Sequence, residues 1–237
     1  MPMVKHPPPN EQLWKKKDRK ADKHAKDHKC VYSMNGDEYR GDYECDKRHG
    51  KGIMNWKSKN MIYNGDWVED KRHGYGLLSK GDDKGGYMKE YAGGWKFDKR
   101  HGYGTAFYGG PSFYEGEWYA GKRHGHGRMV RADGSVYEGG WKDDKECGAA
   151  DLSLPNGNFH KGEWKDGLMH GPGEYHYIDK GQLYRGTWVK GVPRTGTITE
   201  ICRHSAPNPM KYPIPECDLL DIDGVLRTAA EKALAEE

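Results

Sequence analysis

The sequence predicts an all-β protein, an elongated antiparallel β-meander solenoid of about seven hairpin repeats followed by a short C-terminal helix. Three observations support this fold class. Only 34% of the 237 residues are hydrophobic, yet the chain holds 34 Gly, 16 Tyr and 8 Trp, which is unlike a disordered chain. A pattern of rings and glycine recurs about every 23 residues. Its members alternate with polar residues, as in a half-buried strand.

The first half of each repeat reads aromatic, polar, glycine, polar or small, aromatic. The copies start at residues 39, 63, 91, 114, 137, 160 and 184, so the spacings are 24, 28, 23, 23, 23 and 24 residues. The ring positions are Tyr39 and Tyr43, Tyr63 and Trp67, Tyr91 and Trp95, Tyr114 and Trp118, Tyr137 and Trp141, His160 and Trp164, and Tyr184 and Trp188. Because alternate residues of a strand share a face, we expect these rings to form a ladder on the inner face of the sheet.

The second half of each repeat begins with a basic pentapeptide and continues into a Gly-x-Gly strand. DKRHG occupies residues 46–50, 70–74 and 98–102, and GKRHG occupies residues 121–125. We expect the pentapeptide to lie in the connecting loop of each hairpin, with DG and NG turns joining successive hairpins. A unit of this length cannot bury one face alone, so stacking of neighbouring hairpins must bury it.

The combined pattern Y-x-G-x-W-x-x-x-K-x-H-G-x-G resembles the MORN repeat (membrane occupation and recognition nexus) over about residues 39–200. Copy five departs from it with Cys147 and Ala150, and copy seven reads GVPRTG. The flanking segments LWKKKDRKA, VYSMNGDEY and YPIPECDLLDIDGVL are similar to a small animal member of the family that is associated with sperm and axonemes. The resemblance implies a repeat array that binds partner proteins through a groove on its ring-lined face.

The role of the ring ladder can also be predicted without reference to the family. We expect its rings mainly to pack the core. A single-layer sheet, however, leaves part of such a face open, which predicts a groove for an extended or helical peptide segment.

Five histidines occupy the equivalent position in five of the repeats, which suggests either a metal site or a structural role. They are His49, His73, His101, His124 and His170. Two imidazoles on one zinc ion place their nitrogens about 3.3 Å apart, whereas equivalent residues on neighbouring hairpins lie about 9.6 Å apart. We therefore expect no metal site and assign the histidines to loop structure, with a pH-sensitive contact as the alternative. No catalytic or nucleotide-binding signature occurs, so we expect no catalytic residue and no cofactor.

Four Lys-Arg pairs in equivalent positions form a predicted basic edge: Lys47 and Arg48, Lys71 and Arg72, Lys99 and Arg100, and Lys122 and Arg123. One interpretation is a solvated edge that discourages aggregation. The other is a binding stripe for acidic partners such as tubulin tails, acidic helices or phosphoinositide headgroups. We expect no nucleic-acid partner, because the body of the chain is close to neutral.

Composition divides the chain into three segments. Residues 1–30 form a flexible basic arm with nine Lys/Arg and four Asp/Glu, residues 31–200 form the array, and residues 201–237 carry four Lys/Arg and seven Asp/Glu. In the last segment a proline-rich stretch precedes a helix predicted from Gly224 to Ala235 and capped by Asp223. Its face of Val225, Leu226, Ala229, Ala230, Ala233 and Leu234 is expected to pack on the last repeats or on a partner.

Together these features predict a non-enzymatic scaffold. The five cysteines form no CxxC pair, and residues 1–29 contain no apolar stretch, so we expect free thiols in the cytoplasm or cytoskeleton. The resemblance of the flanks implies partner proteins in the axoneme of cilia or sperm flagella and a role in sperm assembly, with the acrosome as a further location. The alternative is a peripheral membrane adaptor that binds anionic phospholipids through the basic edge.

Overall fold

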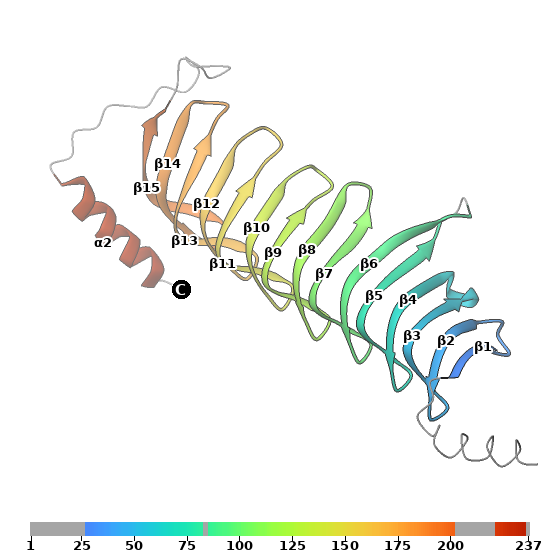
Figure 1. The fold of residues 1–237 in the computed structure, drawn as a ribbon. Helices are drawn as coiled ribbons and strands as arrows, with labels where there is room; N and C mark the ends of the chain where they lie inside the picture. The colour runs from blue at the N-terminus through green and yellow to red at the C-terminus, as the bar shows by residue number, and fades with distance from the viewer. Residues whose placement is uncertain (1–26, 83–84, 202–220, 236–237) are drawn as a thin grey trace, which may run out of the picture. The chain divides into compact units, whose positions relative to one another are not determined.

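The structure is a computed structural model that describes residues 27–82, 85–201 and 221–235. Fifteen strands pair antiparallel in the order of the sequence, β1 to β15 (Figure 1). The predicted all-β meander is therefore confirmed. Residues 1–26 of the predicted basic arm and the proline-rich stretch of residues 202–220 lie outside the described residues, whereas residues 27–30, also assigned to the arm, belong to the first strand of the sheet.

The elements have the following bounds: β1 Asp27–Tyr32, β2 Glu38–Glu44, β3 Lys47–Trp56, η1 Lys57–Lys59, β4 Met61–Val68, β5 Lys71–Gly81, β6 Tyr87–Lys96, β7 Lys99–Gly109, β8 Ser112–Tyr119, β9 Lys122–Val130, β10 Val136–Lys142, β11 Lys145–Ser153, β12 Phe159–Lys165, β13 Leu168–Tyr177, β14 Gln182–Val189, β15 Val192–Glu200 and α2 Ile222–Ala235. The chain forms two compact units. Unit 1 contains residues up to 89 together with 94–99, and unit 2 contains residues 90–93 and those from 100 onward.

Each hairpin closes with a two-residue turn in which both residues have positive φ. In unit 1 these turns include Glu69-Asp70, with φ of 48° and 66°, and in unit 2 they include Asp143-Asp144, with φ of 50° and 71°. Such primed turns match the twist of the strands and favour Asp, Asn or Gly. Of the basic pentapeptide, only the first residue lies in the turn. The prediction that the pentapeptide forms the loop is therefore wrong, because the Lys-Arg-His-Gly that follows already belongs to the next strand.

A bulge follows the turn of the β4–β5 hairpin, and Asp66, the residue between the glycine and the second ring, stabilises it. The β4–β5 register shifts between Gly65 and Asp66. Gly74 adopts a φ of +62°. The Asp66 carboxylate accepts a hydrogen bond of 2.9 Å from the Tyr75 backbone N–H. A short acid at this position thus satisfies backbone that the ladder leaves unpaired.

Helix α2 packs on the last hairpin of unit 2. It contacts β14 and β15, and it lies on the face opposite the rings, since Thr187 and Thr197 line the cavity beneath Leu226. In copy seven this face carries Thr187 and Val189, both 7% exposed. The equivalent residues of copy six are the exposed Glu163 and Lys165. Thr187, in place of the charged Glu163, lines the surface beneath the helix.

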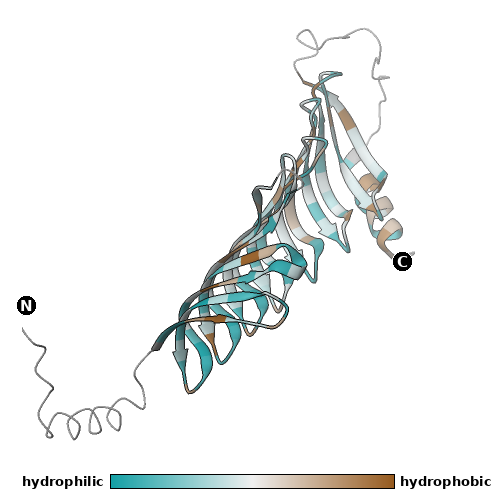
Figure 2. Cartoon of the chain, turned by 90° about the vertical axis from the view of Figure 1, so that its right-hand side faces the viewer, coloured by the Kyte–Doolittle hydropathy of each residue, from teal (hydrophilic) through white to brown (hydrophobic). Residues whose placement is uncertain are grey.

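Two details of the helix differ from the sequence-based expectation. Asp221, not Asp223, caps it, since its Oδ1 accepts a hydrogen bond of 2.9 Å from Gly224 N–H. Leu226 and the three predicted alanines are partly buried, whereas Val225 is 54% and Leu234 39% exposed. Most strand residues are hydrophilic or of intermediate hydropathy, and hydrophobic residues appear on α2 and in a few places on the strands (Figure 2). Among the described residues, no helix has the length and apolar content to cross a bilayer.

Candidate interaction surface

The ring positions of the repeat form the core of each unit. In unit 1 Tyr63 is 0% and Trp67 2% exposed, and in unit 2 Tyr91, Tyr114 and Tyr137 are 0% exposed. Trp95, Trp118, Trp141, Trp164 and Trp188 lie between 2% and 7%, and Tyr39 lies at 3%. Tyr43 and Tyr184, at the ends of the ladder, are only partly buried. Most of the predicted groove residues therefore present little ring surface to a partner.

Tyr63 in unit 1, and Tyr114 and Tyr137 in unit 2, each contact two neighbouring rings, one from their own copy and one from the next. Tyr63 packs edge-on against Trp67 at 5.1 Å and Trp95 at 5.5 Å between ring centroids. Tyr114 packs in the same way against Trp118 and Trp141, both at 5.2 Å. Edge-to-face pairs of this kind add to the area that they bury. The ladder thus couples each hairpin to the following one.

The indole N–H and the glycines set the spacing between copies. Trp67 Nε1 donates to the Gly52 carbonyl at 3.1 Å in unit 1, and Trp141 Nε1 donates to Gly127 at 3.1 Å in unit 2. A Cβ at Gly127 would overlap the Tyr114 ring. Glycine is therefore required where a tyrosine crosses the neighbouring strand.

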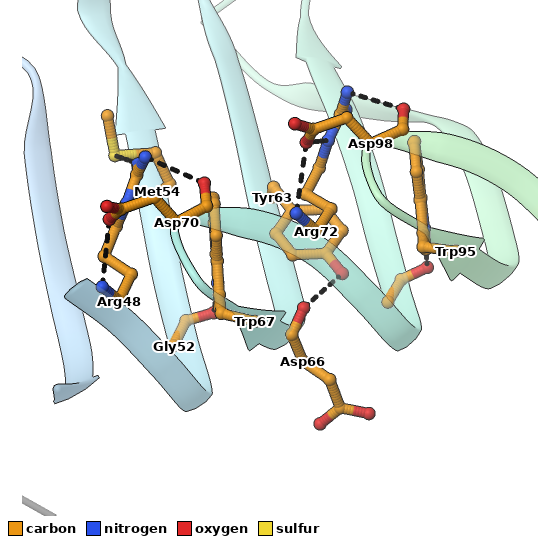
Figure 3. A network of polar contacts seen from close by, with 11 residues as sticks. Arg48, Gly52, Met54, Tyr63, Asp66, Trp67, Asp70, Arg72, Trp95 and Asp98 are labelled. Atoms are coloured by element: carbon orange, nitrogen blue, oxygen red, sulfur yellow. Dashed lines mark hydrogen bonds and ion pairs between the residues drawn. The ribbon is translucent and has the colours of Figure 1, made fainter. Parts of the chain in front are cut away.

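The arginine of each Lys-Arg pair folds back onto the ladder (Figure 3). The Arg48 guanidinium lies 4.5 Å from the Trp67 ring centroid, and its Nε lies 3.0 Å from Asp70 Oδ1. Two further hydrogen bonds join the same two residues through their backbones. Arg48 N–H donates to Asp70 Oδ1 at 2.9 Å, and Asp70 N–H donates to the Arg48 carbonyl at 3.0 Å. We call this arrangement the arginine clamp.

The arginine clamp explains why the pentapeptide recurs with its leading Asp. In unit 1 Arg72 binds Asp98 at 2.9 Å and lies 4.2 Å from Trp95, and in unit 2 Arg123 binds Asp144 at 3.1 Å and lies 4.3 Å from Trp141. The Asp of one copy therefore serves the Arg of the copy before it.

Copy four shows what happens when this Asp is missing. Gly121 takes its place there, and the Arg100 guanidinium contacts the rings of Tyr91 at 5.1 Å and Trp118 at 5.0 Å and forms a distant ion pair of 3.9 Å with Glu90. The backbone half of the clamp remains, since Gly121 N–H donates to the Arg100 carbonyl at 2.9 Å.

The arginine clamp can be tested within unit 2. We expect Arg123→Ala to lower the free energy of unfolding by about 1–2 kcal/mol, from a cation–π contact of about 0.5–2 kcal/mol and a partly exposed ion pair of at most about 1 kcal/mol. Arg100→Ala is the matched control, because Arg100 has the ring contact without the Asp, so its loss is expected to be smaller. Urea unfolding at low and high salt measures both, and the Arg123 value should fall with salt more than the Arg100 value, because the Arg100–Glu90 pair is longer, at 3.9 Å, than the Arg123–Asp144 pair, at 3.1 Å. An equal cost for the two variants would contradict the role of Asp144.

The lysines of the same pairs point to solvent. Lys47, Lys71 and Lys99 in unit 1, and Lys122 in unit 2, are exposed. Lys122 reaches Asp143 at 3.2 Å, and Lys145 of copy five reaches Asp166 at 2.9 Å. The predicted basic edge thus divides into arginines held against the core and lysines available to a partner. Its binding role stays a prediction.

The repeated histidines flank the bulges and contact residues at the hairpin ends. His49 Nε2 lies 3.3 Å from Glu44 Oε2. His73 packs on Phe97 at 5.0 Å, and His101 packs on Tyr119 at 5.5 Å. Nowhere in the described ranges do three or more His, Cys, Asp or Glu side chains group as metal ligands would.

His160, in the tyrosine position of copy six, departs from the ladder chemistry. Its side chain is 1% exposed, and Trp188 packs on it at 4.7 Å. Neither ring nitrogen has a hydrogen-bond partner. Burial lowers the pKa of this imidazole below its ordinary 6.5. In copy four the equivalent Tyr114 OH donates to the Glu117 carbonyl at 3.0 Å, an interaction that imidazole does not make.

This substitution predicts an acid-sensitive repeat. The unfolded chain binds a proton at His160 as the pH falls through 6.5, while the folded chain resists it, so stability is lost between pH 6.5 and the lower folded pKa. We expect His160→Tyr to raise stability at pH 7 by about 1 kcal/mol, through a hydrogen bond to the Glu163 carbonyl. The variant should also lose less stability than the wild type between pH 7 and 5. Thermal melts at both pH values test this, and parallel losses would refute it.

Sequence reasoning missed three of these features. It grouped each Lys with its Arg, although the two side chains point to different environments. It did not single out His160 as a buried, unpaired imidazole, although the change from Tyr was visible. It also placed no significance on Thr187 and Val189, whose departure from the charged residues of copy six was the available signal.

The comparisons agree with this geometry. The MORN repeat family matches residues 39–61, 63–83, 91–109, 114–136, 137–159 and 160–182. The hairpin of copy seven lies beyond these segments. A solved virginiamycin B lyase from Staphylococcus aureus aligns at 10% identity over 80% of this chain and 71% of its own, but with a TM-score of 0.18, which is too low to bear on the fold.

Full-length relatives carry the same family name. The chain is 50% identical to MORN repeat-containing protein 3 of Xenopus laevis, with 100% of this chain and 99% of that one covered. It is 58% identical to the Bos taurus protein and 57% identical to the Homo sapiens protein of the same name, each over 97% of this chain and 95% of theirs. The alternating rings, the glycines that admit them and these matches along the chain lead to one conclusion: the chain belongs to the MORN-repeat family.

Proposed function

We propose that the chain is a non-enzymatic scaffold that binds partner proteins in the axoneme of cilia or sperm flagella and supports sperm assembly. The observation that supports the scaffold role is that each copy uses different side chains for internal packing and for its exposed surface. Inner rings and arginines are engaged in holding copies together, whereas lysines and exposed aromatics such as Tyr75 and Tyr103, 63% and 62% exposed, recur on the outside. Exposed lysines that recur along the array can attract partners with repeated acidic segments, including acidic tubulin tails, and the exposed aromatic side chains can contact partners with segments that bind aromatic rings.

The location rests on the flanking segments, which resemble the axoneme-associated member of the family. Co-sedimentation with axonemes through detergent extraction tests it. We expect the chain to stay in the axonemal pellet and to be released by salt, because exposed lysines form screened contacts. Release by detergent alone would count against an axonemal scaffold.

The exposed lysines also favour a second candidate, a peripheral membrane adaptor. Replacing Lys99, Lys122 and Lys145 with Gln removes exposed charge from equivalent positions of copies three to five and leaves the arginine clamps intact. If the basic edge binds anionic lipid, sedimentation with phosphatidylserine or phosphoinositide vesicles should fall in this variant and at high salt. The matched control replaces Lys51, Lys57 and Lys59, which lie off the basic edge. An equal loss in both variants, or vesicle binding that ignores salt, would refute this candidate.

A further inference from the structure

The last hairpin ends the ladder with an incomplete ring contact. In unit 2 Tyr114 and Tyr137 each contact two indoles, and each is 0% exposed. Within the described residues, Tyr184 contacts one indole, Trp188 at 4.9 Å, and it remains partly exposed. The flank of Tyr184 that faces away from Trp188 therefore lacks the packing that every inner tyrosine of the unit receives from a following repeat.

The strand beside Tyr184 carries the other parts of the same contact. Gly196 of β15 pairs with Gly186 and stands where Gly127 stands in copy four, whose carbonyl accepts the indole N–H of the next repeat. Ile198 occupies the position of Ala106 and Leu152, which are 1% and 9% exposed when a further hairpin follows, but Ile198 is 46% exposed. We call the surface formed by Tyr184, Gly196 and Ile198 the terminal slot.

The backbone of β15 continues this surface. β15 pairs with β14, and no other described strand follows it in the sheet. The outer edge of a terminal strand presents N–H and C=O groups that can pair with an added strand. The terminal slot and this edge together reproduce the surface that each earlier hairpin offers to the next.

We infer that the terminal slot binds an extended strand of a partner protein that carries a tryptophan. The occupied slots of the same unit define this ligand: a strand pairs antiparallel, its indole packs edge-on against the tyrosine, and the indole N–H meets the glycine carbonyl. Strand addition supplies affinity through the backbone, and the ring pocket supplies specificity.

Other occupants fit the terminal slot less well. The segment that follows β15, residues 202–220, contains no tryptophan and has prolines at 207, 209, 213 and 215, which cannot donate to a ladder. In a second copy, the tryptophan strands are already paired within their own array, and the terminal strand β1 carries no tryptophan. This inference deepens the proposed scaffold role and rests on it only in taking the ligand to be a protein.

Fluorescence anisotropy with the full chain and a labelled peptide tests the inference. The probe is the sequence of residues 112–119, SFYEGEWY, whose Trp118 fills the equivalent slot against Tyr91 at 5.5 Å. We expect saturable binding that weakens at least tenfold when the peptide tryptophan is replaced by alanine. Ile198→Lys should weaken binding to a similar extent, and this variant should fold, because the side chain is already exposed. Tyr103→Leu, at an exposed ring on the opposite face, is the matched control and should bind like the wild type.

Three results would overturn the inference: no saturable binding to a chain with a native melting curve, equal binding of the alanine peptide, or no effect of Ile198→Lys. Light scattering at the same concentrations provides a fourth outcome. Self-association that Ile198→Lys abolishes would make a second copy the occupant and would refute a partner strand. Any of these results leaves retention in axonemes, the test of the scaffold role, unchanged.

Discussion

Replacing Trp141 with alanine is expected to lower the free energy of unfolding of unit 2 by about 3–5 kcal/mol. The indole is 3% exposed and contacts both Tyr114 and Tyr137 at 5.2 Å. It also donates to the Gly127 carbonyl and supports the Arg123 guanidinium. Its loss leaves a cavity between copies four and five and removes the contacts that join them.

Because repeats are stabilised mainly by their neighbours, the loss of stability should extend to the strands on both sides of this interface. Urea unfolding followed by circular dichroism measures the loss, and hydrogen exchange should show faster opening of β8 to β11 than of β2 to β5. Tyr103→Ala is the control, since its ring is 62% exposed on the opposite face. A loss below about 1 kcal/mol for Trp141→Ala, within the range of an ordinary substitution, would contradict the ladder as the main source of stability.

Adding one methyl group at Gly76 is expected to destabilise unit 1 by about 1–3 kcal/mol. A Cβ at this position would overlap the Oη and Cζ atoms of Tyr63, which is 0% exposed. The Tyr63 ring cannot turn aside without losing Trp67, Trp95 and its hydrogen bond of 3.1 Å to the Asp66 carbonyl. Gly76→Ala therefore tests steric exclusion rather than backbone freedom, since the backbone φ of Gly76 is not positive.

The neighbouring residue offers a matched control. Tyr75 lies in the same strand with its side chain 63% exposed, so Tyr75→Ala removes many more atoms but should change stability far less. Thermal melts of the two variants compare them directly. If Gly76→Ala melts at the wild-type temperature, the tyrosine has room to move, and close approach is not the reason for glycine here.

The order of the strands and the members of the core could be predicted from the sequence because both depend on local alternation. In a strand, residues two apart share a face, so Tyr63, Gly65 and Trp67 had to lie together, and their return at a regular spacing required stacking hairpins. Three of the connecting turns, at residues 35–36, 133–134 and 156–157, followed from Asp-Gly and Asn-Gly pairs for the same local reason. Gly134 N–H, for example, donates to the Arg131 carbonyl at 3.0 Å.

What the pattern alone determined about this protein is therefore the meander and its aromatic core. Only the tertiary structure decided how that core is used, because the deciding contacts join residues of different copies. Arg48 and Asp70 are 22 residues apart in the chain, yet they form one clamp. Lys47 and Arg48 are adjacent, yet one faces solvent and the other faces Trp67. Alternation places a side chain on a face, but only the neighbouring copy determines whether that face becomes core, helix seat or terminal slot.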